Sequence, residues 1–144
     1  MSKSSAICLD ANIIIRVVMR SDDSVQERWH NWIEHGRRLI APTLLFYEVV
    51  NGLYQYRKHD YISESVLIKA VKTALAMPVE IVNDAGIHQR AVSLAVQLSL
   101  SATYDAHYLA LAERIGAELW TGDRKLVRSA HQSGLDWVNF CKIL

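Results

Sequence analysis

The chain has 144 residues, of which 51% are hydrophobic and 22% are charged, and its formal net charge is +1. This composition is that of a globular protein and excludes a disordered one, and a chain of this size can bury roughly two thirds of its unfolded surface. We therefore expect one domain over residues 1–144. The small net charge excludes a globally basic protein, so any affinity for nucleic acid must come from local clusters of lysine and arginine.

The cysteines and the apolar runs bear on where the protein works. Cys8 and Cys141 are the only cysteines, which excludes a disulfide-dense scaffold and favours a reducing compartment with both thiols buried. No apolar stretch approaches the roughly 20 residues of a membrane span. The start, MSKSSAICLDAN, has no signal-peptide core before its first acid. We therefore expect a cytoplasmic protein without a membrane partner.

The first half of the chain alternates short apolar runs with helical patterns. Residues 6–9 form an apolar run too short for a helix, which predicts a strand buried on both faces of a parallel sheet. Ser24 and Glu27 have the spacing of a capping box at the start of a helix that Gly36 ends. The predicted elements are a strand at 6–9, a helix from residue 12, the capped helix before residue 36, a strand at 38–41 and a long helix from 43 to about 56.

The second half continues the same alternation. Ser63 is placed to cap a helix that Pro78 closes, and Asn83 or Asp84 is placed to cap the next one. The predicted elements are a helix from 63 to about 76, a strand at 79–82, helices to about 98 and at 104–115, a strand at 118–120, a helix from 124 to about 133 and a strand at 137–140. Strands separated by helices predict an α/β fold with a parallel sheet between two helical layers.

Four acidic residues occupy positions where such a fold places functional sites. Asp10 and Asp123 each follow a predicted strand, and Asp105 lies in the first turn of a predicted helix. Open α/β proteins place their sites at the carboxyl ends of the strands. Glu48 lies inside the apolar helical run LLFYEVVNGL, so its carboxylate requires a partner, a proton or a cation. Together these acids predict a metal site.

Hydrolysis of phosphodiester bonds is the chemistry that such a site suits. One or two divalent cations can activate water and stabilise both the pentavalent charge and the leaving oxygen, and Mg²⁺ binds carboxylate oxygens. Singly, each acid has a structural alternative, because Asp10, Asp105 and Asp123 suit helix starts and Glu48 can pair with an arginine. A phosphatase with an aspartyl nucleophile is disfavoured, since the residue two positions after Asp10 is Asn12 rather than a second acid.

The sequence around these acids resembles the PIN domain family, especially its VapC-like toxin branch. LDAN contains Asp10, YEVVNGL contains Glu48, YDAHYLALAE contains Asp105 and WTGDRKL contains Asp123. Their order, spacing and neighbouring residues are similar to the four acidic blocks of that family, and the resemblance covers essentially the whole chain. It implies a PIN-like, Rossmann-like fold with three α/β/α layers and a central parallel sheet.

The resemblance also implies an activity and partners. It implies an Mg²⁺- or Mn²⁺-dependent endoribonuclease, the toxin of a type II toxin–antitoxin pair, which forms a homodimer and binds a small antitoxin protein. By position, Asp10, Glu48, Asp105 and Asp123 would form the catalytic and metal-binding set, with Glu48 acting on water. In-line attack would leave a 5′-phosphate and a 3′-hydroxyl. This chemistry does not use the 2′-hydroxyl, so only the resemblance favours RNA over DNA.

Polar and basic residues near the acids complete the hypothesis. Asn12 and Thr121 match polar positions of the family blocks and would orient an acid or a water molecule. Two basic groups follow Asp10 and Asp123 in sequence and are candidate phosphate contacts, with a solvated helix face as the alternative: Arg16, Arg20, Arg124, Lys125 and Arg128. A PIN-like module that binds RNA or protein without cutting is the competing interpretation. The sequence does not identify the target RNA.

Overall fold

A central parallel sheet organises the protein, whose computed structural model describes residues 6–141. The strand order is β3-β2-β1-β4-β5, and every neighbouring pair is parallel. Chain order reverses beside β1, because β2 and β3 lie on one side of it and β4 and β5 on the other. The strands are β1 (Ala6–Leu9), β2 (Arg38–Pro42), β3 (Glu80–Val82), β4 (Glu118–Thr121) and β5 (Val138–Phe140).

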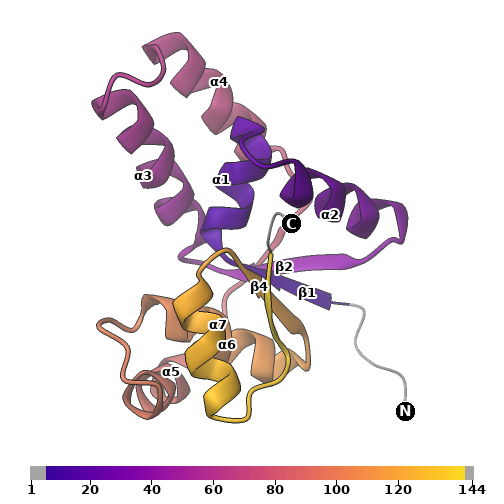
Figure 1. Cartoon of the computed structure of the whole chain (residues 1–144), viewed down its shortest axis with the longest axis vertical. Helices are drawn as coiled ribbons and strands as arrows, with labels where there is room; N and C mark the ends of the chain where they lie inside the picture. The colour runs from indigo at the N-terminus through magenta and orange to yellow at the C-terminus, as the bar shows by residue number, and fades with distance from the viewer. Residues whose placement is uncertain (1–5, 142–144) are drawn as a thin grey trace.

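Helices cover both faces of the sheet, which confirms the predicted three-layer α/β/α fold (Figure 1). The helices of the first half lie on one face, and α3 and α4 form a hairpin that extends beyond the sheet (Figure 1). These helices are α1 (Ala11–Met19), α2 (Asp23–Glu34), α3 (Leu45–Lys58) and α4 (Glu64–Leu75). The opposite face carries α5 (Ile87–Gln97), α6 (Tyr104–Ile115) and α7 (Arg124–Gln132). Within residues 6–141, no helix combines the length and the apolar character that crossing a membrane requires.

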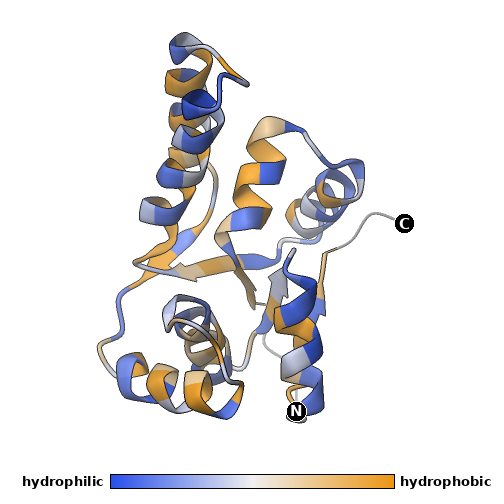
Figure 2. Cartoon of the chain, turned by 60° about the vertical axis from the view of Figure 1, so that its left-hand side comes forward, coloured by the Kyte–Doolittle hydropathy of each residue, from blue (hydrophilic) through white to orange (hydrophobic). Residues whose placement is uncertain are grey.

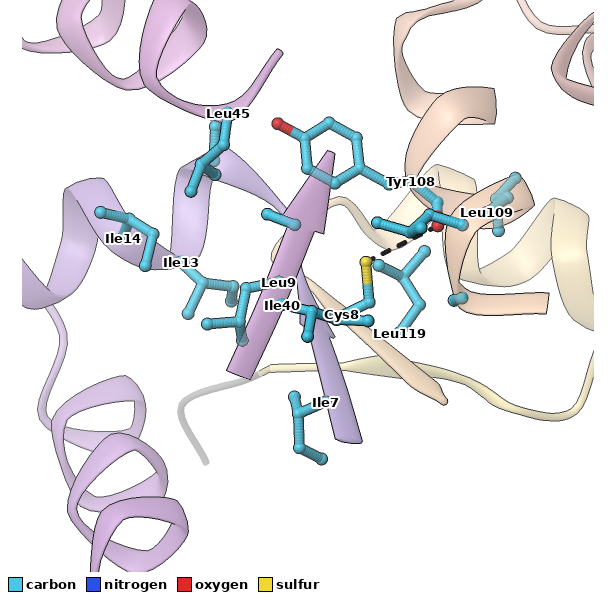
Figure 3. Close-up of a cluster of buried hydrophobic side chains, with 14 of the residues drawn as sticks. Ile7, Cys8, Leu9, Ile13, Ile14, Ile40, Leu45, Tyr108, Leu109 and Leu119 are labelled. Atoms are coloured by element: carbon cyan, nitrogen blue, oxygen red, sulfur yellow. Dashed lines mark hydrogen bonds between the residues drawn. The ribbon is translucent and has the colours of Figure 1, made fainter. Parts of the chain in front are cut away.

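The core lies between the sheet and its two helical layers. All four side chains of β1 are buried, as expected for a central strand that is covered on both faces. Ile13 and Ile14 of α1 pack onto one face of the sheet and Leu109 of α6 onto the other (Figure 3). α1 is mostly hydrophobic along its length (Figure 2), which suits a helix enclosed by α2, α3, α4 and β4. The carboxyl end of β1 is therefore held in place by packing on both faces of the sheet.

The two thiols are buried and unpaired, as the sequence predicts. Cys8 Sγ lies 3.7 Å from the backbone oxygen of Tyr108, to which it donates a hydrogen bond (Figure 3). Burial raises the pKa of the Cys8 thiol far above its usual range and that of Cys141 to about 11. Neither thiol is therefore a nucleophile at neutral pH.

The start of α2 differs from the sequence prediction. The helix begins at Asp23, and the buried side chain of Asp22 accepts a hydrogen bond of 3.1 Å from the Val25 amide. The predicted capping box of Ser24 and Glu27 is therefore wrong, because an aspartate two residues earlier satisfies the exposed amide.

The start of α5 also differs from the prediction. The helix begins at Ile87 without a side-chain cap. Asp84 instead accepts a hydrogen bond of 2.9 Å from the Gly86 amide and forms an ion pair of 2.6 Å with Arg114. The expectation that Asn83 or Asp84 caps this helix is wrong, because a turn separates these residues from its first residue. Ser63, by contrast, caps α4 as predicted.

Candidate active site

Asp10 occupies the point where the strand order reverses. Its amide donates to the Trp120 oxygen at 3.1 Å, which continues the β1–β4 ladder to the carboxyl edge of the sheet. The side chain is 6% exposed. One oxygen, Oδ1, accepts from the Ala11 amide at 2.7 Å and so caps α1, while Oδ2 accepts from Thr121 Oγ1 at 2.7 Å. The carboxylate is therefore held by both strands at the switch point.

Asn12 and Thr121 link Asp10 to the loop that carries Asp123. Asn12 Nδ2 donates to Asp10 Oδ2 at 3.2 Å, and its Oδ1 accepts from the Gly122 amide at 2.9 Å. Thr121 Oγ1 accepts from the Asp123 amide at 3.0 Å while donating to Asp10. The two polar residues that the sequence singled out thus fix the relative position of two acids by hydrogen bonds.

Asp123 begins α7 at the same edge of the sheet. Its Oδ1 accepts from the amides of Lys125 and Leu126 at 3.0 and 3.2 Å. Its Oδ2 has no hydrogen-bond donor among residues 6–141. Asp123 therefore caps α7 and Asp10 caps α1, as the structural alternative for these two residues predicted. Capping uses one oxygen of the Asp123 carboxylate and leaves the other available.

Glu48 approaches this edge from α3 and is positioned by a tyrosine. The Tyr108 hydroxyl donates a hydrogen bond of 2.7 Å to Glu48 Oε1. The ring of Tyr108 is packed into the core, with its hydroxyl directed away from Leu109 (Figure 3). Burial and the neighbouring Glu48 carboxylate raise the pKa of Tyr108 far above its usual range, so the hydroxyl remains a donor. No arginine pairs with Glu48 within the described residues.

Asp105 lies in the first turn of α6, as predicted, and faces an open pocket. The pocket has a volume of about 440 Å³ and is lined by Glu48, Asp105 and Asp123 together with Lys125 and Tyr104. Ser99, Ser101 and Ser129 also line the pocket, beside apolar residues such as Leu100 and Leu126. The pocket therefore combines three carboxylates with groups that can bind phosphate.

The acids raise one another's pKa values. Burial raises the pKa of Asp10 to about 7, and the charges of Asp105 and Glu48 add to this effect, while the hydrogen bond from Thr121 opposes it. The pKa of Asp105 is also raised, first by burial and then by the charges of Asp123 and Glu48. This coupling shows that the four carboxylates are electrostatic neighbours although they come from four elements.

The donor set agrees with a hard divalent cation. Mg²⁺ and Mn²⁺ prefer carboxylate oxygens, and a cation would offset the repulsion that raises the pKa values of Asp10 and Asp105. Within residues 6–141, no three His, Cys, Asp or Glu side chains are close enough to hold a metal ion as they stand. Coordination by three of these acids would therefore require carboxylate rotation or bridging water, and Mg²⁺ sites usually retain water.

The five basic residues predicted from the sequence are not gathered in one place. Lys125 lines the acidic pocket, whereas Arg124 and Arg128 line a separate pocket beside Phe140. The Arg16 guanidinium lies against Gly122, where a β-carbon would be 2.6 Å from Nη1, and it forms a 3.6 Å ion pair with Asp22.

Arg20 is exposed and ends α1 in the left-handed conformation, with φ of 51°. Of the predicted phosphate contacts, Lys125 is therefore the one that lines the acidic pocket, and Arg16 adjoins the Asp123 loop.

Tyr108 and the serines that line the acidic pocket were not predicted from the sequence. Tyr108 lies three residues after Asp105 in YDAHYLALAE, so helical spacing places both on one side of α6 and provided a usable signal. Ser99, which has φ of 54°, and Ser101 lie in the loop between α5 and α6. Their position beside Asp123 depends on the packing of α7 against the sheet, for which the sequence contains no local signal.

The fold and site define a doubly wound α/β protein with carboxylates at the topological switch point. A sequence model of the PIN domain matches residues 7–132, so the chain belongs to the PIN domain family. No curated protein sequence matches the chain significantly.

Solved structures share this fold. A toxin–antitoxin complex from Klebsiella pneumoniae has a TM-score of 0.70 at 20% identity, covering 96% of this chain and 99% of that one. VapBC2 from Rickettsia felis, bound to a DNA fragment from its promoter, has a TM-score of 0.68 at 14% identity, with 95% and 99% covered. PAE2754 from Pyrobaculum aerophilum has a TM-score of 0.67 at 23% identity, with 86% and 78% covered.

Proposed function

We propose that this protein is a divalent-metal-dependent endoribonuclease that hydrolyses RNA phosphodiester bonds. The observation that carries the proposal is the convergence of Asp10, Glu48, Asp105 and Asp123 at one edge of the sheet, with raised pKa values at Asp10 and Asp105 and no cationic partner among the described residues. Membership of the PIN domain family supports the same activity.

Each acid has a distinct task in this proposal. Asp10, Asp105 and Asp123 would hold Mg²⁺ or Mn²⁺, which when bound supplies an activated water and stabilises the charge that develops on the phosphate. Glu48 positions or deprotonates the attacking water with the oxygen that Tyr108 does not occupy. Asn12 and Thr121 orient Asp10, and Lys125 contacts a substrate phosphate at the pocket wall.

The partners are also part of the proposal. One structure of the same fold is a toxin–antitoxin complex and another is VapBC2 bound to promoter DNA, which supports a small antitoxin partner for this chain. Such a partner could insert an arginine among the unpaired carboxylates. A homodimer is proposed as well, and exposed apolar side chains such as Tyr47 and Tyr54 on α3 offer surface for either contact. We place this activity in the cytoplasm.

Cleavage of a structured RNA pool by the purified protein tests this function. The reaction is run with Mn²⁺, Mg²⁺ or EDTA on the wild type, on Asp105→Asn and on Asp136→Asn, the same substitution at an exposed acid away from the pocket. We expect metal-dependent cutting by the wild type and the control, and a loss of about 100-fold or more in Asp105→Asn. Circular dichroism checks that each variant folds.

The same assay separates the non-catalytic alternative. A binding module would retain RNA affinity in EDTA, cut nothing in any metal and respond equally to both substitutions. That outcome, with no metal binding detected by calorimetry, would reject the nuclease.

A further inference from the structure

A second pocket lies at the same edge of the sheet, on the other side of Tyr104. It is formed where β2 and β3 end, with Thr43 directly after β2 and Asn83 directly after β3. The first turns of α5 and α6 close it with His88 and His107. Tyr104, which is 59% exposed, lines both this pocket and the acidic one, so the two cavities adjoin at this residue.

A hydrogen bond joins the two histidines. His107 Nδ1 lies 2.7 Å from the backbone oxygen of Thr103, which can only accept, so Nδ1 donates to it. His107 Nε2 and His88 Nδ1 lie 2.9 Å apart and share one hydrogen bond. The remaining ring nitrogen, His88 Nε2, has no hydrogen-bond partner among the described residues.

Other polar groups of this pocket also lack partners. The Asn83 amide and the Thr43 hydroxyl make no side-chain hydrogen bond within residues 6–141, and both residues are exposed. An amide that offers a donor and an acceptor side by side is a common reader of nucleobase edges. Together with the unpaired His88 Nε2, the Asn83 amide and the Thr43 hydroxyl give the pocket polar groups beside the apolar surfaces of Leu44 and Ile87.

The size of the pocket restricts its ligand. Its volume is about 120 Å³. A cavity of about 150 Å³ accepts one benzene ring, so this smaller pocket can enclose at most one six-membered ring and not a whole nucleotide. A base held there would leave its ribose and phosphate outside, and Tyr104 would direct them toward the acidic pocket.

We propose that this pocket is a nucleobase subsite that selects a pyrimidine next to the cleaved phosphate. The base would lie against the Tyr104 ring, and Asn83 and His88 would read its polar edge. A base in this position must be unpaired, so the substrate would be a single-stranded segment or loop. This inference rests on the proposed nuclease function for its biological meaning, but binding of a base can be measured without cleavage.

Binding of mononucleotides tests the subsite independently of catalysis. In EDTA, the imidazole proton resonances of His88 and His107 are followed by NMR while UMP, CMP, AMP or GMP is added. We expect both resonances to shift with UMP or CMP, and the Kd for the purine nucleotides to be at least about fivefold higher. Asn83→Ala should weaken pyrimidine binding about tenfold. Gln89→Ala, an exposed neighbour on α5 that does not line the pocket, should leave it unchanged.

Cleavage products provide the second measurement. The wild type and Asn83→Ala cut a randomised single-stranded RNA pool, and sequencing of the new ends gives the base preference at the cut. We expect the wild type to show a pyrimidine preference at one position beside the cut, and Asn83→Ala to lose it.

The two measurements also separate the two proposals. No shift with any nucleotide, or equal shifts for purines and pyrimidines, would overturn the subsite even if the protein cuts RNA. A pyrimidine-specific shift in a protein that cuts nothing would retain the subsite and reject the nuclease.

Discussion

The acids at the carboxyl edge of the sheet differ from the acids elsewhere in the molecule. Glu80 and Glu113 each accept two hydrogen bonds from one arginine, Arg38 and Arg90 respectively, and these bonds lower their pKa values. Asp10 has no cation beside it, and burial with neighbouring carboxylates raises its pKa to about 7. The same chemical group is thus stabilised in its charged form in one region and destabilised in the other.

This difference separates structural acids from candidate functional ones. An exposed carboxylate with an arginine partner is electrostatically satisfied and contributes little to stability or chemistry. Carboxylates that repel one another destabilise the fold, so they are expected mainly where function requires them. Strongly perturbed pKa values therefore indicate candidate functional sites. Substitutions in the two groups of acids should therefore differ in their effect on activity and stability.

Replacing Asp10 with asparagine should abolish the activity without unfolding the protein. Asp10→Asn keeps the shape of the side chain and removes the charge, so cleavage of RNA should fall by about 100-fold or more. A fluorescent RNA assay in Mn²⁺ measures the rate, and urea unfolding measures the stability. Equal activity in Asp10→Asn and the wild type would show that the unpaired acids are not a catalytic site.

Stability should fall as the pH rises toward neutrality. The folded pKa of Asp10, about 7, lies above its usual value of 3.8, so the folded state retains a proton that the unfolded chain has lost. Protonated Asp10 therefore stabilises the fold fully below pH 3.8, and this stabilisation is lost as the pH approaches 7. The free energy of unfolding should fall by about 2 to 3 kcal/mol between pH 5 and 8.

Urea unfolding of the wild type and Asp10→Asn at pH 5 to 8 in EDTA measures this loss. The curve of the variant should be flatter, because asparagine does not titrate. Added Mn²⁺ should raise the wild-type melting temperature most at the higher pH, where the carboxylates are charged. Parallel pH curves for the two proteins would contradict the assigned origin of the effect.

Removing the Tyr108 hydroxyl should have an intermediate effect. Tyr108→Phe leaves Glu48 without its donor, which lies 2.7 Å away in the wild type, and should destabilise the fold by about 1 kcal/mol. Activity should fall about tenfold because Glu48 loses its orientation. Tyr56→Phe, whose hydroxyl makes no hydrogen bond within the described residues, is the matched control. Unchanged activity in Tyr108→Phe would remove Tyr108 from the site.

Neutralising a paired acid outside the site should have the smallest effect. Glu80→Gln removes the charge that Arg38 contacts at 2.8 Å on an exposed edge of the sheet. Solvent screens this pair, so both the urea midpoint and the RNA cleavage rate should remain within experimental error of the wild type. A loss of activity comparable to that of Asp10→Asn would remove the contrast between the two groups of acids.

Local patterns in the sequence predicted most of the fold. The apolar run at 6–9 predicted the short buried strand β1, and the helical period after Thr103 matched α6 at both ends. Gly116, with φ of 75°, ends α6 in a conformation that glycine adopts readily. The misplaced starts of α2 and α5 arose because several polar residues stood near each start, and only the backbone path decides which one caps.

The sequence predicted the acids of the candidate site, and the family resemblance added Asn12 and Thr121, but the contacts that hold the acids were not predictable. An acid directly after a strand and an acid inside an apolar helix can be recognised in the sequence. A carboxylate buried at such a position requires a partner, a proton or a cation. The Tyr108 hydrogen bond spans 60 residues and the Thr121 bond spans 111, so no local pattern could place them. The scattering of the predicted basic residues has the same cause.

The sequence by itself thus determined the α/β alternation, the buried thiols and the identity of the acids, because these depend on neighbouring residues and on period. Tertiary structure decided which side chains meet. The reversal of strand order beside β1 brings Asp10 next to Thr121 and the Asp123 loop, and the packing of α5 on α6 joins His88 to His107. Such contacts follow from the arrangement of whole elements, which no single stretch of sequence specifies.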